Sequence, residues 1–188
     1  MKKETRQRRG LVALAGWLAL CAAGGALAGP AEDYAEAEKL FASGELIVAM
    51  QLALKAAEAG HAEAQARVGA VLDKSEEDDQ AFEWFSKSAA QGNAAGQFGL
   101  GEMYAKGEGV KQDMAQAYKL LVLAADQGHP QATMMIMLAY KAGGLGLTPD
   151  PQQYQLWLEK LKLAMPDYQP AAPALAKAKV VRRRGERK

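Results

Sequence analysis

Residues 104–129, YAKGEGVKQDMAQAYKLLVLAADQGH, decide the fold of this chain. The stretch opens with a turn that contains two glycines, and Asp113 follows the turn in a position to cap a helix. Small and apolar residues then recur three and four positions apart from Ala117 to Leu121, the spacing of a helix buried along one stripe. Gly128 ends the stretch, and glycine readily takes the left-handed conformation that terminates a helix. The stretch therefore predicts one amphipathic helix and the start of another.

The same pattern recurs towards the N-terminus of the chain. Gly60, Gly92 and Gly128 each follow a small, alanine-containing segment and stand 32 and 36 residues apart. Each of these glycines is followed directly by a histidine or an asparagine. The fourth residue after each glycine is an alanine or a glycine. Repeats of this length predict stacked helix pairs, since one pair cannot bury its apolar stripe alone.

Each unit is predicted to contain two helices. The first helices are expected at 61–72, 93–104 and 129–140, and the second helices at 79–89, 113–125 and 150–162. A pair at 34–42 and 45–57 precedes them, and a short capping helix is expected near 171–179, where Pro166, Pro170 and Pro173 interrupt the preceding helix pattern. Val, Ile and Thr are scarce, which argues against a sheet protein. The sequence therefore predicts an all-α fold over residues 29–179, in units of 34–60, 61–92, 93–128 and 129–165.

The loop of the quoted stretch, followed by the small residues before Gly128 and His129, resembles the Sel1-like repeat, a relative of the tetratricopeptide repeats. The resemblance covers roughly residues 34–165. The loop at 73–78 and the glycine-rich loop at 143–146 depart from the family pattern. The resemblance implies an α-solenoid of antiparallel helix pairs, a right-handed superhelix that binds a partner protein on its concave face.

In such folds the first helix of each pair lines the concave face. A rotation of 100° per residue selects the positions that point away from the core. The predicted partner-binding residues are Glu63, Arg67, Lys74, Phe98, Glu102, Lys106, Gln131, Met134, Met135 and Leu138.

Four of these residues are apolar: Phe98, Met134, Met135 and Leu138. Exposed aromatic and methionine side chains suit contact with a partner, so they predict an apolar patch in the C-terminal half of the groove. The alternative is that the C-terminal helix covers them as part of the core.

The N-terminal 28 residues have the layout of a secretory signal peptide. Five basic residues and one acid precede an uncharged apolar run at 10–28, which ends in Ala-Leu-Ala. Cleavage is predicted after Ala28, which leaves Gly29 as the N-terminus and a periplasmic protein. The alternatives are an uncleaved inner-membrane anchor at 10–28 and a lipoprotein modified at Cys21, although Leu20 departs from the lipoprotein pattern.

The near-neutral net charge of +1 conceals three differently charged segments. Residues 29–176 hold 11 basic residues against 20 acids, and residues 177–188 hold seven basic residues against one acid. An acidic body argues against nucleic-acid binding. The tail at 180–188 is predicted to be disordered, and it either aids solubility or contacts anionic lipid or an acidic partner through Arg182, Arg183, Arg184, Arg187 and Lys188.

No catalytic or cofactor constellation is apparent in the sequence. His61 and His129 lie two units apart, too far to share a metal ion, and are expected to start helices. The acidic run at 76–79 lacks the alternating ligands of a calcium loop, and Asp79 is expected to cap a helix instead. Cys21 is the only cysteine, so thiol chemistry is excluded once the signal is removed. No cofactor, metal or catalytic residue is predicted, and the protein is not expected to be an enzyme.

The function expected from these features is that of an exported scaffold or adaptor of the bacterial cell envelope, which binds a protein partner. One alternative is a periplasmic immunity or inhibitor protein that neutralises a toxin. The other is a hydrolase of cell-wall compounds, which resembles some Sel1-like proteins but lacks their cysteines. Membrane contact is expected only through an uncleaved N-terminal segment or the basic tail.

Overall fold

The computed structural model describes residues 29–170. The predicted signal peptide, with Cys21, the predicted capping helix at 171–179 and the basic tail at 180–188 all lie outside the described residues. The eight described helices are α1 (Pro30–Ser43), α2 (Leu46–Glu58), α3 (Ala62–Lys74), α4 (Asp78–Ala90), α5 (Ala94–Lys106), α6 (Met114–Asp126), α7 (Pro130–Ala142) and α8 (Pro151–Ala164). No strand forms within this part of the chain, where Gly144 and Leu147 make an isolated bridge.

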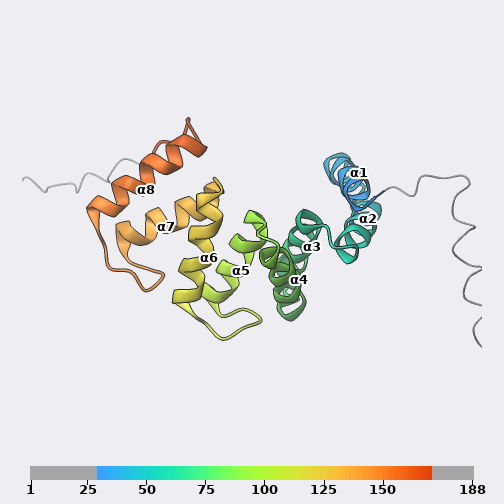
Figure 1. Cartoon of the computed structure of the whole chain (residues 1–188), viewed down its shortest axis with the longest axis horizontal. Helices are drawn as coiled ribbons and strands as arrows, with labels where there is room; N and C mark the ends of the chain where they lie inside the picture. The colour runs from blue at the N-terminus through green and yellow to red at the C-terminus, as the bar shows by residue number, and fades with distance from the viewer. Residues whose placement is uncertain (1–28, 171–188) are drawn as a thin grey trace, which may run out of the picture.

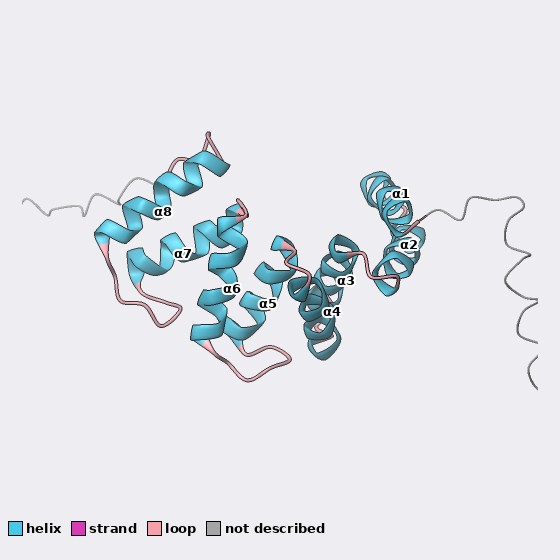
Figure 2. Ribbon diagram, viewed as in Figure 1, coloured by secondary structure: helices cyan, strands magenta, loops and turns pink. Residues whose placement is uncertain are grey.

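The helices pack as four consecutive pairs, each odd-numbered helix with the even-numbered helix that follows it. Each pair then packs on the next through α2–α3, α4–α5 and α6–α7, so the array extends in one direction (Figures 1 and 2). The predicted all-α solenoid of stacked helix pairs is therefore confirmed. None of the described helices is long and apolar enough to cross a membrane.

The helix starts follow from the residues that cap them. The side chains of His61, Asn93 and His129 accept hydrogen bonds from backbone amides in the first turns of α3, α5 and α7. Asp113 and Asp150 cap α6 and α8 in the same way, as predicted. These side chains satisfy amides that have no partner within the helix.

The expected cap at Asp79 is wrong. Helix α4 begins at Asp78, its N-cap residue is Glu77, and no side chain makes the capping hydrogen bond. Asp79 therefore lies within the first turn. Its carboxylate still suits that position, because the N-terminal end of a helix carries partial positive charge.

A glycine in the left-handed conformation follows the ends of α2, α4 and α6. Gly60, Gly92 and Gly128 have φ values of 93°, 81° and 83°. A Cβ atom at any of the three would meet nothing within 4 Å, so the backbone conformation alone calls for glycine.

The core consists of three clusters of buried side chains along the array. Alanines make up much of it, and several of them are completely buried. Short side chains bring the helix backbones close together. Gly69 and Gly99 both lie directly against the ring of Phe85. A Cβ atom added at Gly69 would lie 2.9 Å from a ring atom, and one added at Gly99 would clash with the ring.

Candidate partner-binding face

The odd-numbered helices form one layer, which we call the odd-helix face. Helices α3 and α5 pack closely together, whereas no two even-numbered helices among the described residues do so. At α3 and α5 the odd-numbered helices therefore lie closer together than the even-numbered helices do. The odd-helix face is the side on which the sequence predicted the partner-binding residues.

At the N-terminal end of this face, Arg67 of α3 is tied to α1. Its guanidinium donates from Nε and Nη2 to the Glu38 carboxylate, both at 2.8 Å, and lies 4.7 Å from the centre of the Phe41 ring. Burial and the neighbouring Glu38 raise the pKa of Tyr34 to about 12. Arg67 thus lies on the predicted face, but its charge is already neutralised by a bidentate ion pair.

In the middle of the face, acidic side chains outnumber basic ones. Glu102 of α5 is half-buried, and this burial raises the pKa of its carboxyl group. Asp73 of α3 and Glu108 raise it further, while Lys106 opposes them. Lys106, however, places its ammonium 3.1 Å from Glu108. The predicted residues Glu102 and Lys106 therefore belong to one cluster that carries a net negative charge.

At the C-terminal end, the four predicted apolar residues lie on α5 and α7. Phe98 stacks on the His129 ring with centroids 4.7 Å apart, and Phe98, Met134 and Met135 are half-buried against the core. Burial also lowers the pKa of His129. Leu138 is 45% exposed. The patch therefore has one exposed residue and three that pack partly against the core. The alternative, that a C-terminal helix covers these residues, concerns residues 171–179, which lie outside the described residues.

The remaining predicted residues Glu63, Lys74 and Gln131 are exposed. No group of histidine, cysteine, aspartate or glutamate residues in 29–170 could hold a metal ion.

A set of buried polar residues escaped the sequence analysis. Asp33, Gln65, Gln97 and Thr133 occupy the same place in successive odd-numbered helices, and all four are buried. Asp33 pairs with Lys55 at 2.8 Å, Gln65 accepts from Gln91 at 2.7 Å, and Gln97 accepts from Gln127 at 2.8 Å. They recur along the sequence at the spacing of Gly60, Gly92 and Gly128. This regular spacing could have identified them from the sequence.

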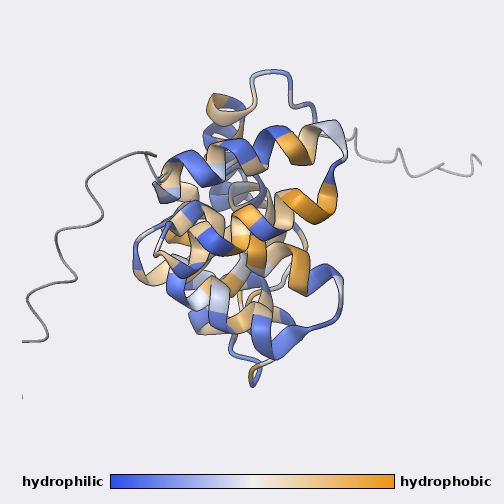
Figure 3. Ribbon diagram, turned by 90° about the vertical axis from the view of Figure 1, so that its right-hand side faces the viewer, coloured by the Kyte–Doolittle hydropathy of each residue, from blue (hydrophilic) through white to orange (hydrophobic). Residues whose placement is uncertain are grey.

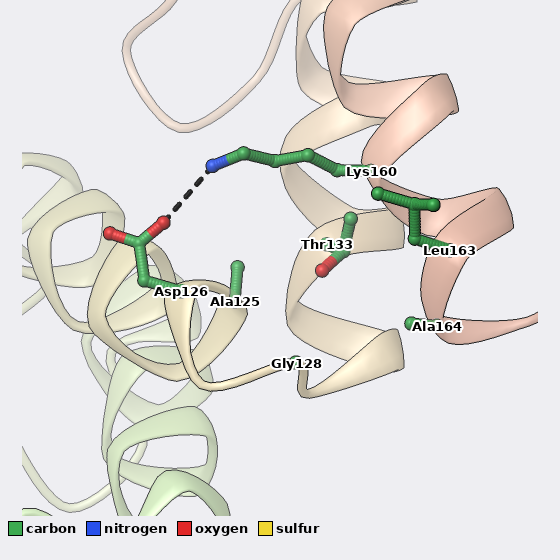
Figure 4. Close-up of a pocket in the computed structure, with 7 residues that line it drawn as sticks. All are labelled: Ala125, Asp126, Gly128, Thr133, Lys160, Leu163 and Ala164. Carbon is green, nitrogen blue, oxygen red and sulfur yellow. Dashed lines mark hydrogen bonds and ion pairs between the residues drawn. The ribbon is translucent and has the colours of Figure 1, made fainter.

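The glutamine pair is missing from the last unit, and a pocket of about 460 Å³ lies there. Thr133 stands at the first glutamine position and bonds to the carbonyl of His129 at 3.0 Å. Lys160 of α8 reaches across the pocket to Asp126 of α6 at 3.0 Å (Figure 4). The larger glutamine side chains of earlier units are therefore replaced here by open space.

A second exposed apolar surface lies at the start of α2. Leu46, Ile47 and Val48 follow one another there and are all exposed, Ile47 by 78%. Figure 3 looks onto this end of the array, where the hydrophobic colour gathers at the start of α2. The corresponding residues of α4 are Asp78, Asp79 and Gln80, so this run is a feature of the first pair alone.

Comparison with known proteins agrees with this architecture. The chain matches the Sel1 repeat model at residues 46–61, 62–93, 94–129 and 132–160. A search of curated proteins gives no match.

Three solved structures are similar to the chain. The crystal structure of a Sel1 repeat protein from Oxalobacter formigenes is 28% identical, with a TM-score of 0.64, and the match covers 72% of this chain and 58% of that one. A protective antigen of uropathogenic Escherichia coli strains, which displays an SLR fold, is 31% identical, with a TM-score of 0.61 and coverage of 74% and 34%. A Sel1 repeat protein from Klebsiella pneumoniae is 22% identical, with a TM-score of 0.61, and the match covers 72% of this chain and 68% of that one. At this identity the similarity supports the fold alone.

The matching segment spans less than two thirds of the length of the first two of these proteins. The repeat fold itself is generally a scaffold for protein–protein interaction. The family model covers more than half of the residues and follows the helix pairs along the array. The chain therefore belongs to the Sel1 repeat family.

Proposed function

We propose that this protein is an exported scaffold or adaptor of the cell envelope, which binds a partner protein through the odd-helix face. The observation that carries the proposal is the composition of that face. Half-buried Phe98, Met134 and Met135 and exposed Leu138 form its apolar part, and Phe98 lies one turn before Glu102 of the acidic cluster on α5. Aromatic and methionine side chains on a rigid scaffold are typical of protein-binding surfaces.

Leu138→Asp is expected to weaken binding at least tenfold, because it places a charge in the centre of the apolar end of the face. The protein should be tagged, captured with its partner from an envelope fraction, and compared with the variant at matched concentrations. Phe98 and Met135 are poorer choices, since both pack against the core and a charge there would also disturb folding.

Leu123→Asp provides the matched control. Leu123 is 43% exposed, close to the 45% of Leu138, but it lies on the even-numbered helix α6. Equal capture by wild type and the Leu138 variant would contradict the assigned face. A partner lost only on mutation of Ile47 would move the binding surface to the start of α2. An exported toxin as the captured partner would favour an inhibitor role over an adaptor role.

The mature protein is expected to begin at Gly29, as measured by the intact mass of protein isolated from the envelope. The support is that α1 begins at Pro30 with Gly29 as its N-cap, so cleavage after Ala28 removes no part of the helix. An intact mass that includes residues 1–28 would favour a membrane anchor. A lipid adduct on Cys21 would favour the lipoprotein alternative.

A further inference from the structure

Two glutamine side chains join the helices within each of the two middle pairs. Gln91 of α4 donates from Nε2 to Gln65 of α3 at 2.7 Å, and Gln127 after α6 donates to Gln97 of α5 at 2.8 Å. In both pairs the accepting glutamine lies four residues after the N-cap residue of its helix, and the donating one lies fourteen residues after the N-cap residue of the next helix. The same two places can therefore be located in α7 and α8.

Both places hold smaller side chains in the last pair. Counting from the N-cap residues His129 and Asp150 gives Thr133 and Ala164. Thr133 and Ala164 both line the pocket of about 460 Å³ at α6, α7 and α8 (Figure 4). The pocket therefore includes the place that a glutamine side chain fills in each of the two preceding pairs.

A backbone acceptor of the missing amide is still in place. In the preceding pair, Gln127 Nε2 also donates to the carbonyl of Gly92 at 2.9 Å, and Gly92 directly precedes the N-cap residue of α5. Gly128 holds the same place before α7 and lines the pocket. Among the hydrogen bonds formed within residues 29–170, none ends at the Gly128 carbonyl. This carbonyl therefore lacks the donor that Gln127 supplies one unit earlier.

Thr133 and Lys160 supply the other polar groups of the pocket. The Thr133 hydroxyl donates to the His129 carbonyl at 3.0 Å, so its oxygen can still accept a hydrogen bond. Lys160 contacts Asp126 at 3.0 Å through Nζ, and an ammonium group has further N–H donors to offer. The pocket thus has two acceptors, on Gly128 and Thr133, and a donor on Lys160.

We propose that this pocket binds a primary carboxamide, the group at the end of a glutamine or asparagine side chain. Its NH2 group donates to the Gly128 carbonyl and the Thr133 hydroxyl, and its oxygen accepts from Lys160. A carboxylate of the same shape has no N–H donor and would place an oxygen against two acceptors. The site goes beyond the proposed function, because Phe98 and Leu138 of the odd-helix face do not line it.

The experiment titrates the mature chain, residues 29–188, with three tripeptides that have glutamine, glutamate or methionine between two alanines. Acetyl and N-methylamide groups block the peptide ends, so the glutamine side chain is the only primary carboxamide. Chemical shifts of the backbone amides of Gly128, Thr133 and Ala164 in the 15N-labelled protein report binding. A ligand that contributes one side chain is expected to bind in the millimolar range.

The glutamine peptide is expected to shift these three amides and to bind at least fivefold more tightly than the glutamate or methionine peptide. Free glutamine is a fourth ligand that separates two sources of the same group. Tighter binding of the peptide would assign a segment of a partner chain, and tighter binding of free glutamine would assign a small molecule. A glutamine peptide that leaves the three amides unshifted, or that binds no better than the methionine peptide, would overturn the proposal.

Two variants of Thr133 test the acceptor. Thr133→Val removes the hydroxyl and keeps the shape, so it is expected to weaken binding of the glutamine peptide about fivefold, the usual effect of one hydrogen bond. Thr133→Ser retains the hydroxyl and is expected to bind like the wild type. Equal binding by the valine and serine variants would reject the role of this oxygen and with it the proposed site.

Ala164→Gln fills the pocket from within the chain. Ala164 is exposed, so the longer side chain can be accommodated. The variant is expected to lose binding of the glutamine peptide and to unfold at a higher urea concentration, because its own amide reaches Gly128 and Thr133. Ala164→Glu is the matched control and is expected to show no such stabilisation, since it lacks the N–H donors. Undiminished peptide binding by Ala164→Gln would place the peptide elsewhere and overturn the proposal.

Discussion

Phe85→Ala is expected to lower the free energy of unfolding by about 3–5 kcal/mol, a cost typical of a large aromatic removed from a packed core. The ring is 5% exposed and belongs to the middle core cluster, together with Ala81, Leu100 and Met103. It extends from α4 between α3 and α5, where Gly69 and Gly99 leave room for it. A cavity at this point would therefore weaken three helices at once.

The position of Phe85 makes the effect larger than its buried area alone suggests. In a repeat array each unit contacts only its neighbours, so stability depends on the interfaces between them. Phe85 lies at the junction between the N-terminal and C-terminal pairs. Urea unfolding of the variant, followed by circular dichroism, should show a lower midpoint and a broader transition, because the two halves then unfold less cooperatively.

Phe82→Ala is the matched control on the same helix. Phe82 is half-buried and meets Tyr104 edge-on at 5.8 Å, without glycines on both sides. Its loss should cost distinctly less than the loss of Phe85. A Phe82 variant as unstable as the Phe85 variant would contradict the role assigned to the glycine-lined slot.

The sequence was sufficient to predict the helices because their signals are local. Capping residues and left-handed glycines act within one turn, so Asp113 and Gly128 identify helix ends without knowledge of any neighbour. Contacts between units were harder to predict. The Phe85 ring that fills the space next to Gly69 comes from another helix, and no local signal pairs the two residues.

The candidate face shows the same limit. Helical periodicity placed Arg67 and Leu138 on one layer, and both lie on odd-numbered helices. Periodicity could not reveal that Glu38, 29 residues earlier, neutralises Arg67. Nor could it reveal how far Phe98 is buried, because that depth depends on the ring of His129, 31 residues later, and on the core cluster formed by the following helices.

Gln65→Ala is expected to lower the free energy of unfolding by about 2–3 kcal/mol, although glutamine is ordinarily a surface residue. The Gln65 amide donates to the Ala57 carbonyl of α2 at 3.0 Å and accepts from Gln91, the C-cap of α4, at 2.7 Å. One side chain in α3 therefore links the helices on both sides. Its removal leaves the carbonyl of buried Ala57 with one partner fewer, where water replaces the bond poorly, and it also removes the acceptor of Gln91.

Gln91→Ala separates the hydrogen bond from the cavity. Gln91 is exposed, so its loss should cost only about 1 kcal/mol, the usual net value of one hydrogen bond. The double variant should be more stable than the sum of the two single losses implies, by about 0.5–1.5 kcal/mol, because the bond between the two glutamines can be lost only once. Strictly additive losses would show that the two side chains stabilise the array independently. A Gln65→Leu variant as stable as the wild type would show that the buried position needs volume rather than a hydrogen bond.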